Sequence, residues 1–394
     1  MSGLALMDLN SLLSHVIEIG GSDLHLKVDS VPMARIDGTL TPIIGEGPLT
    51  DEVLERFLLQ VSERTPAKRE HFYESGDLDT AYLAEDVGRF RVNGFRQRGS
   101  ISFAFRFVPA EVPNFEKLGL PVGVRKLSGE HRGLVLVTGA TGSGKSMTLA
   151  AMVDEINRTR KEHIVTIEDP IEIMHPDQGC IVNQREVGLD TESYSQALRR
   201  VLRQDPDVIL IGELRDEESA RAALQAAESG HFVLSTMHTI DVTETVARMV
   251  EFFAPAKQMM VRQILAGVLR GVVSQRLLPR IDGGRVAAVE VMLNTARIAD
   301  LIRDPEKTEQ ITEALEDGSF YNMQSFSQHL VRLVLAEEID FETAAAAATN
   351  RHDFEIAVQQ AQRMKKVAEA DAAPEDEEAA PEVDDDEVSH LRLA

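Results

Sequence analysis

The stretch "GLVLVTGATGSGKSMTLAAMVDEIN", residues 133–157, joins an apolar run to a helical pattern through a glycine-rich segment. Its centre, "GATGSGKS" at 139–146, fits the pattern G-x-x-x-x-G-K-[ST] of a phosphate-binding loop. Glycines let the backbone wrap an anion with its N–H groups, and the N-terminus of the following helix adds a positive dipole. The alternative is an ordinary glycine-rich turn, but the strand before it and the helix after it favour a nucleotide site. The predicted site comprises Gly139, Ala140, Thr141, Gly142, Ser143, Gly144, Lys145, Ser146 and Met147.

Two polar side chains of this loop have predictable roles. Lys145 should reach the β- and γ-phosphates of a bound nucleotide, as the lysine of such a loop does. The Ser146 hydroxyl should coordinate Mg²⁺, a cation that prefers oxygen ligands and remains bound to substrate phosphates. We therefore expect ATP and Mg²⁺ as the ligands of the loop.

Further apolar runs predict the sheet around this loop. The runs "GLVLVTG", "HIVTIED", "DVILIGE" and "HFVLSTMHT" are separated by helical patterns. They do not alternate with polar residues, which suits a parallel sheet covered by helices on both faces. A hairpin is predicted in "RIDGGRVAAVEVML", around Gly283 and Gly284.

Acidic residues follow two of these runs, at the carboxyl edge where parallel sheets bind ligands. In "DPDVILIGELRD", residues 205–216, Glu213 follows the apolar run after Gly212. It lies on the correct edge to contact Mg²⁺ through water or to activate the attacking water. Glu168, Asp169 and Glu172 follow "HIVTI" at the same edge, where converging negative charges need a cation. Glu172 is a second candidate for positioning or deprotonating water, and the pattern does not divide the roles; a surface acid without a role is the alternative.

Two histidines flank the run "FVLSTM" at its two ends. His238 stands at the carboxyl end and is the better candidate for sensing the γ-phosphate. His231 stands at the other end and is a second candidate. Their spacing does not match a helical zinc motif such as H-E-x-x-H, and the alternative for each is a core or loop histidine.

Three arginines are candidate arginine fingers, which stabilise developing phosphate charge across a subunit boundary. "ESYSQALRRVLRQ" reads as a helix that places Arg199 and Arg203 four residues apart on one face. Arg215 follows Glu213 closely in the chain. Ion pairs with nearby acids on a solvated face are the alternative for all three.

Composition excludes several classes of protein. The 394 residues are 43% hydrophobic, which indicates a largely globular chain, and carry a net charge of −24. Such an acidic balance argues against nucleic acid as the main partner. Cys180 is the only cysteine, which excludes an intrachain disulfide or a multi-cysteine zinc site. No apolar run approaches the ~20 residues of a membrane span, so we expect a cytoplasmic protein that meets a membrane only through a partner.

The chain divides into four regions. Residues 1–108 mix helical and alternating strand patterns, as in "LNSLLSHVIE" and "GRFRVNGFRQRGSISFAFRFV", and predict a small α+β domain. Residues 109–121 contain three prolines and read as a linker. Residues 122–369 predict the α/β nucleotide-binding domain with a helical C-terminal part. Residues 370–394 are acidic, with little to bury, and predict a disordered tail.

The motifs resemble those of a known superfamily. "GATGSGKS", "TIEDPIE", "LRQDPDVILIGELRD" and "ESGHFVLSTMHT" are similar, in that order, to the Walker A motif, Asp box, Walker B motif and His box of type II/IV secretion ATPases. "GSDLHLKV" and the short first domain resemble the type IV pilus retraction ATPases (PilT/PilU-like) within that superfamily. The resemblance covers most of the chain.

This resemblance implies an N-terminal PAS-like domain, a RecA-like P-loop ATPase domain and a homohexamer that binds ATP between subunits. It implies a motor at the inner face of the cytoplasmic membrane. There, ATP-driven domain rotations would remove pilin subunits through an inner-membrane platform protein, causing pilus retraction and twitching motility. The matched motifs place Glu172 in the Asp box, Glu213 in Walker B, His231 and His238 in the His box, and Arg199, Arg203 and Arg215 where the family has arginines that contact nucleotide in trans.

Other functions were weighed against retraction. Pilus-extension and type II secretion ATPases share the core but generally carry a tetracysteine zinc motif and longer N-terminal modules. A nucleotide-binding regulator without productive turnover would not need the second acid, Glu172, and a DNA translocase is disfavoured by the net charge. The retraction subgroup usually has "AIRNLIRE" where this chain has "ARIADLIRD", residues 296–304, which leaves open a main or an accessory retraction ATPase.

Overall fold

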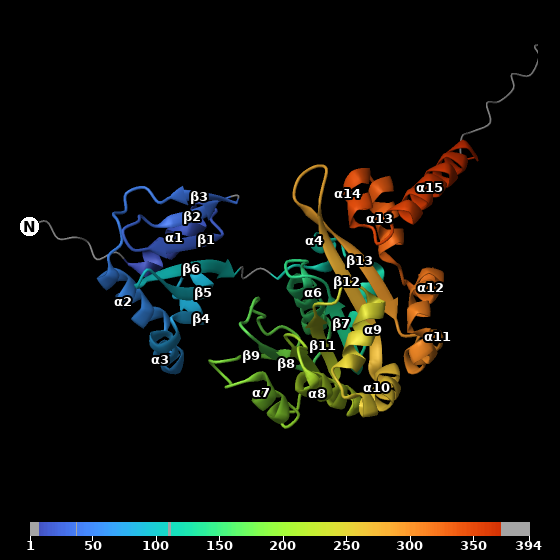
Figure 1. Ribbon diagram of the computed structural model, residues 1–394, viewed down its shortest axis with the longest axis horizontal. Helices are drawn as coiled ribbons and strands as arrows, with labels where there is room; N and C mark the ends of the chain where they lie inside the picture. Colours follow the sequence, from blue (N-terminus) through green and yellow to red (C-terminus); the bar gives the residue numbers. More distant parts are fainter. Residues whose placement is uncertain (1–7, 37, 109–111, 372–394) are drawn as a thin grey trace, which may run out of the picture.

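The structure, a computed structural model, describes residues 8–36, 38–108 and 112–371. A six-stranded sheet is formed by the chain up to residue 108, and a seven-stranded sheet follows it (Figure 1). Helices accompany both sheets, so the mixed α/β class predicted from the sequence is confirmed.

The first sheet is antiparallel throughout, in the order β3-β2-β1-β6-β5-β4. The predicted alternation is seen in β5, where Phe90 and Val92 are buried and Arg91 between them is exposed. Its hairpin with β6 turns at Arg98 and Gly99, which both have positive φ (52° and 88°), as a two-residue hairpin with a type I′ turn requires. The strands are β1 (Asp23–Lys27), β2 (Met33–Ile36), β3 (Thr39–Pro42), β4 (Asp77–Ala84), β5 (Gly88–Gln97) and β6 (Ser100–Val108).

Three helices complete the N-terminal part. Their apolar side chains share one hydrophobic core with the first sheet, so this part has a core of its own. Asp8 caps the first helix by accepting a hydrogen bond from Ser11 N at 2.9 Å, which satisfies one of the free N–H groups of the first turn. The helices are α1 (Leu9–Glu18), α2 (Asp51–Val61) and α3 (Pro66–Ser75).

The second sheet has the order β13-β12-β7-β11-β10-β8-β9. All neighbours are parallel except the β12–β13 hairpin, which confirms the predicted parallel strands and the predicted hairpin. The polar edge strand β9 was not predicted. The strands are β7 (Gly133–Thr138), β8 (His163–Glu168), β9 (Ile181–Glu186), β10 (Val208–Ile211), β11 (Phe232–Met237), β12 (Leu269–Pro279) and β13 (Arg285–Leu293).

Helices cover both faces of this sheet, as its continuous apolar strands require. One face packs against α4 (Phe115–Leu118), α5 (Val122–Ser128) and α6 (Lys145–Thr159). The other face packs against α7 (Tyr194–Val201), α8 (Glu217–Glu228), α9 (Val242–Glu251), α10 (Pro255–Val268), α11 (Ala296–Arg303) and α12 (Ile311–Glu316). Cys180 is buried between the sheet and α6, as expected for a small hydrophobic side chain.

A C-terminal group of helices packs on the outer ends of β12 and β13. Its helices are α13 (Phe326–Leu335), α14 (Phe341–Ala347) and α15 (Arg351–Asp371), preceded by the 3₁₀ helices η1 (Pro305–Gln310) and η2 (Asp317–Tyr321). The predicted disordered tail began at residue 370, but α15 continues to 371, and 372–394 lie outside the described residues. Within the described ranges, no helix is long and apolar enough to cross a membrane.

The two sheets meet through an ion pair of opposite charges. Arg89 of β5 contacts the Glu186 carboxylate of β9, and the two side chains are only 11% and 1% exposed. Glu186 also accepts a hydrogen bond from Ile171 N at 3.2 Å. Because desolvation offsets the attraction within a buried ion pair, we expect this pair to fix the geometry between the sheets more than to stabilise the fold.

Candidate active site

The phosphate loop connects β7 to α6 at the carboxyl edge of the second sheet. Gly139 and Gly144 both have positive φ, 142° and 92°. A Cβ on Gly139 would lie 2.3 Å from Gln275 O, and one on Gly144 would lie 2.7 Å from Gln275 Nε2. Both positions therefore require glycine, for backbone conformation and for space.

Lys145 begins α6, and its side chain turns back into the loop. Its Nζ donates hydrogen bonds to Gly139 O at 2.8 Å and Ala140 O at 2.9 Å. Burial lowers the pKa of Lys145, and the negative charge of Glu172 partly opposes that shift. Ser143 Oγ is buried without a hydrogen-bond partner among the described residues. A buried hydroxyl and an ammonium group in a glycine-rich loop are suited to an incoming phosphate.

The backbone around Glu213 is anchored to the two neighbouring strands. Gly212 N donates to Ile167 O of β8 at 2.8 Å, and Leu214 N donates to Thr236 O of β11 at 3.0 Å. The Thr236 hydroxyl also donates to Gly212 O at 2.7 Å. Glu213 is therefore held at the carboxyl edge between β8 and β11, where the sequence predicts it.

Gly212 makes room for an aromatic side chain of the site. A Cβ at this position would lie 2.5 Å from the hydroxyl oxygen of Tyr194, the first residue of α7. Burial raises the pKa of Tyr194, and the nearby Asp169 carboxylate raises it further. The neutral phenol thus lies between the end of β10 and the acids after β8.

The Glu213 side chain is only 13% exposed, and its two carboxylate oxygens differ: Oε2 is in hydrogen-bond reach of a histidine, whereas Oε1 contacts an arginine but forms no hydrogen bond within the described residues. His238 Nε2 lies 3.0 Å from Oε2, and Arg215 Nε pairs with Oε1. The pKa of His238 is lowered chiefly by burial, and also by the positive charges of Lys145 and Arg215. His238 thus contacts the Glu213 carboxylate and lies within electrostatic reach of Lys145 in the phosphate loop.

The acids at the end of β8 and just after it lie in different surroundings. Glu168 accepts hydrogen bonds from Thr166 Oγ1 at 2.6 Å and from Gln184 Nε2 at 3.1 Å, and its burial raises its pKa. Glu172 is exposed and close enough to Lys145 to influence its pKa. Of these two acids, Glu172 is the one whose charge reaches the phosphate loop.

The structure does not bring His231 to this site. His231 lies at the amino end of β11, where its Nδ1 is 3.1 Å from Ala226 O and 2.9 Å from Ser229 Oγ. These contacts close the C-terminal end of α8, a structural role at the sheet edge opposite the phosphate loop. The strand itself separates His231 from His238.

The predicted arginine helix is shorter than expected. α7 ends at Val201, so the prediction that Arg203 continues the helical face of Arg199 is wrong. The chain leaves the helix in a tight turn in which Arg203 N donates to Arg200 O at 3.0 Å, ahead of Asp205 with its positive φ of 54°. Arg199 is exposed and pairs with Glu218 at 2.7 Å.

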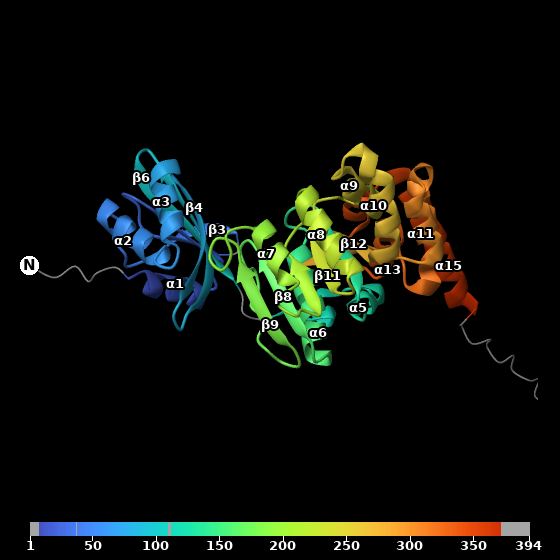
Figure 2. The same cartoon turned by 90° about the horizontal axis from the view of Figure 1, so that it is seen from below.

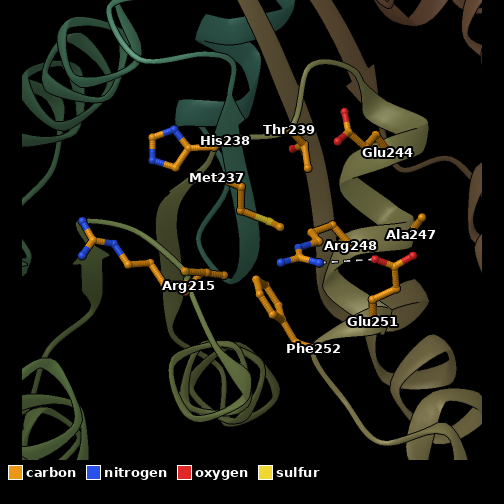
Figure 3. A pocket seen from close by; sticks show the side chains of 10 residues that line it. Arg215, Met237, His238, Thr239, Glu244, Ala247, Arg248, Glu251 and Phe252 are labelled. Atoms are coloured by element: carbon orange, nitrogen blue, oxygen red, sulfur yellow. Dashed lines mark ion pairs between the residues drawn. The ribbon is translucent and has the colours of Figure 1, made fainter.

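A cavity of about 500 Å³ opens beside the His238 segment (Figure 3). Met237, Arg248 and Phe252 converge on its centre, whereas Arg215 and His238 point outward from its rim. Arg248 pairs with Glu251 at 3.5 Å on α9. The lining is completed by Leu214, Thr239, Glu244 and Ala247.

The polar groups present fit a nucleotide-bound Mg²⁺ better than a metal held by protein alone. Within the described residues, no cluster of three or more His, Cys, Asp or Glu could hold a metal ion. Mg²⁺ often takes one or two protein oxygens, with phosphates and water completing its shell. Ser146 at the start of α6 and Glu213 at the same carboxyl edge of the sheet would supply those oxygens, beside the Ser143 hydroxyl, which has no partner among the described residues.

Three residues of the site were not predicted from the sequence. Tyr194, Gln275 and Thr148 all contact the phosphate loop or the Glu213 segment. A sequence signal was present for Gln275, because an amide inside the apolar strand "LRGVVSQRLLP" must find a partner when buried. Tyr194 carried no such signal, since its place depends on the glycine at 212.

The fold and the site define a P-loop ATPase, and comparison with known proteins gives its family. The chain belongs to the family of type II/IV secretion system proteins, whose model matches residues 3–370. Within this family it is a PilT/PilU-like ATPase.

Three relatives support that placement. The type IV pilus retraction ATPase PilT of Pseudomonas aeruginosa is 42% identical over 88% of this chain and all of its own length. The type IV pilus ATPase PilU of the same organism is 39% identical, over 89% of this chain and 91% of its own. A crystal structure of the pilus retraction motor PilT with bound ADP is 42% identical, with a TM-score of 0.82, and the match covers 89% of this chain and 99% of that one.

Proposed function

We propose that this ATPase is the subunit of a motor that powers type IV pilus retraction, using the site around Lys145, Glu172 and Glu213. The observation that carries the proposal is the shared edge at which the phosphate loop, the Glu213–His238 pair and Glu172 lie. The similarity to PilT over the whole length of that relative supports the cellular role.

Nucleotide binding begins at the phosphate loop. Lys145 exchanges its bonds to the carbonyls of Gly139 and Ala140 for the β- and γ-phosphates of ATP. The Ser143 hydroxyl gains the partner that it otherwise lacks among the described residues. Ser146 and Glu213 would hold Mg²⁺, and the ion would supply positive charge that neutralises the phosphate oxygens.

The two glutamates orient or deprotonate the attacking water. Glu213 is prepared for this by His238, which fixes one carboxylate oxygen, and by the backbone anchors to β8 and β11. Arg215 contacts the other oxygen without a hydrogen bond within the described residues and is itself 67% exposed, so it can leave that oxygen when a neighbouring subunit offers a phosphate. Glu172 approaches from β8 and is the second candidate for the water.

The assembly belongs to the same proposal. A homohexamer would place exposed Arg199, Arg203 and Arg215 against the nucleotide of a neighbouring subunit, as arginine fingers. Residues 1–108 would act as a PAS-like domain and 122–369 as a RecA-like domain. Of the predicted linker 109–121, residues 115–118 form α4 and pack on the second sheet, so the linker would be shorter than the sequence predicts; 109–111 lie outside the described residues. Rotation between these domains would drive an inner-membrane platform protein at the cytoplasmic face of the membrane.

Deleting the gene and imaging the cell surface tests this function. Loss of a retraction motor leaves excess, immobile pili, and a plasmid copy carrying Lys145→Ala should fail to restore twitching. A plasmid copy of the parental chain is the matched control. Cells without pili would contradict the proposal and indicate the extension ATPase. Normal retraction in the deletion strain would reject the role of main motor and favour an accessory one.

A further inference from the structure

A buried glutamine in the strand beside the phosphate loop contacts both sides of that loop. Gln275 lies on β12, which pairs in parallel with β7, and it is 3% exposed. Its Nε2 donates to Ser143 O at 2.8 Å, and its Oε1 accepts from Thr148 Oγ1 of α6, also at 2.8 Å. One planar amide thus joins the loop to the first turns of the helix that follows it.

The first of these bonds fixes the direction of a loop carbonyl. A loop that binds phosphate must turn its N–H groups inward and its carbonyl oxygens away from the anion. Gln275 holds the Ser143 carbonyl on the β12 side, next to Gly144, where a Cβ would meet the amide nitrogen. If the amide were lost, a buried carbonyl would be left without this partner, and the loop could relax toward other conformations.

The second bond fixes the helix relative to the loop. Thr148 is 1% exposed, and its N–H donates to Gly144 O at 3.1 Å, so it belongs to the first turn of α6. Its hydroxyl meets the acceptor end of the same amide that holds Ser143. The donor and acceptor of Gln275 are both used, and exchanging them would break both bonds.

We propose that Gln275 is a positioning residue for nucleotide binding, which holds the phosphate loop in its anion-binding conformation through Ser143 O and Thr148 Oγ1. The inference rests on the proposed function of this loop as the ATP site. Gln275 does not touch the phosphates in this account, because its two polar groups are occupied by the loop and the helix.

The test measures Mg·ADP affinity by calorimetry, and ATP turnover, with the full chain carrying Gln275→Met. This variant keeps the length of the side chain and removes both hydrogen bonds. We expect affinity to fall roughly 10- to 100-fold, the size expected for an unsatisfied buried group. KM for ATP should rise by a similar factor while kcat stays within about threefold, because the interaction prepares binding rather than the chemical step.

The matched control is Gln324→Met, at another buried glutamine, whose amide donates to Val289 O away from the phosphate loop. It should lower the melting temperature without changing Mg·ADP affinity. The isosteric Thr148→Val removes one of the two Gln275 bonds and should weaken Mg·ADP binding less than Gln275→Met does. If Gln275→Met does not fold, the Mg·ADP affinity of Thr148→Val alone tests the proposal.

Two results would overturn the inference. One is parental affinity in Gln275→Met, or in Thr148→Val where only that variant folds. The other is a loss of Mg·ADP affinity in Gln324→Met that stands in the same proportion to its loss of stability as in Gln275→Met. Lys145→Ala keeps the two hypotheses apart: parental Mg·ADP binding in that variant would reject the nucleotide site itself, whatever Gln275 does.

Discussion

Glu213 combines a fixed backbone with a carboxylate whose two oxygens face different partners. His238 favours its neutral form, because its pKa is lowered by burial and by the positive charges of Lys145 and Arg215. Arg215, in contrast, is a permanent cation. A carboxylate held in this way keeps its orientation and can exchange its cationic partner. Release of Arg215 is the step that would make the Glu213 carboxylate available to water or to Mg²⁺.

Replacing Glu213 with glutamine should separate binding from turnover. Glu213→Gln keeps the size of the side chain and removes the charge and basicity, so we expect ATP hydrolysis to fall ~10²-fold or more. Mg·ADP affinity should change far less than in Lys145→Ala, which removes the charge beside the phosphates. Single-turnover kinetics and calorimetry measure the two quantities. Parental turnover in Glu213→Gln would show that the acid is misassigned.

At the scale of elements, β13 and α13 meet through two buried groups with opposite pKa shifts. His329 of α13 accepts a hydrogen bond from Val289 N at 2.8 Å, and burial lowers its pKa to about 4. Glu290 of β13 accepts from Val242 N at 2.9 Å and from Phe326 N at 3.4 Å, and burial raises its pKa to about 7. Through Glu290, the first turns of α9 and α13 share one carboxylate.

These shifts predict opposite effects on the pH dependence of stability. In the unfolded chain, His329 is protonated below its ordinary pKa of about 6.5, whereas the folded chain keeps it neutral down to about pH 4. The contribution of His329 to stability is therefore fully present above about pH 6.5 and is lost as the pH falls toward 4. Glu290 holds its proton more tightly in the folded chain than in the unfolded chain. Its contribution to stability is therefore fully present below about pH 4.5 and is lost as the pH rises toward 7.

Denaturant unfolding at several pH values checks both signs. Relative to the parent, the free energy of unfolding of His329→Gln should fall as pH rises from about 5 to 8, and that of Glu290→Gln should rise. Each effect should amount to a few kcal/mol at most, because a shift of one pKa unit is worth about 1.4 kcal/mol. Slopes of the same sign in the two variants would contradict the assigned protonation states.

The elements also show where sequence reasoning succeeds. Continuous apolar runs predicted β7, β8, β10 and β11, because burial on both faces leaves an unmistakable pattern. β9 has mixed exposure and polar residues, and it exists only because it pairs with the edge of β8, so periodicity missed it. The end of α7 was also missed. The helical sequence pattern continues to Arg203, but the chain turns before Asp205, so the helix ends at Val201. The candidate site was found where charge follows a strand. Tyr194 depended on tertiary contacts alone, and the polar residue within an apolar strand that marks Gln275 was not used.

At the scale of the whole molecule, the two sheets are coupled near the catalytic edge. Arg89 comes from the N-terminal sheet, and Glu186 ends β9, next to the strand that leads to Glu172. Figure 2, which views the molecule from below, shows β9 and α7 on the side of the second sheet that faces the N-terminal part. A domain rotation during the ATPase cycle would have to move or break this pair.

Removing the arginine should loosen the two parts relative to each other. Arg89→Ala leaves the buried Glu186 carboxylate without its cation, and breaking a buried pair in this way costs about 3–5 kcal/mol. We expect a broader distribution of distances between spin labels placed in the two parts, measured by pulsed electron resonance. Arg91→Ala, at an exposed arginine of the same strand, is the matched control. An unchanged distribution in Arg89→Ala would show that the pair does not restrain the domains.

A crystal structure of the chain with Mg²⁺ and a non-hydrolysable ATP analogue tests the central claim most directly. The account predicts the phosphates inside the 139–146 loop, Lys145 Nζ moved from the carbonyls of Gly139 and Ala140 onto them, and Glu213 bound to Mg²⁺ directly or through one water. Glu172 should face the γ-phosphate from the β8 side. Phosphates in the loop with both carboxylates turned away, beyond the reach of one bridging water, would contradict the account.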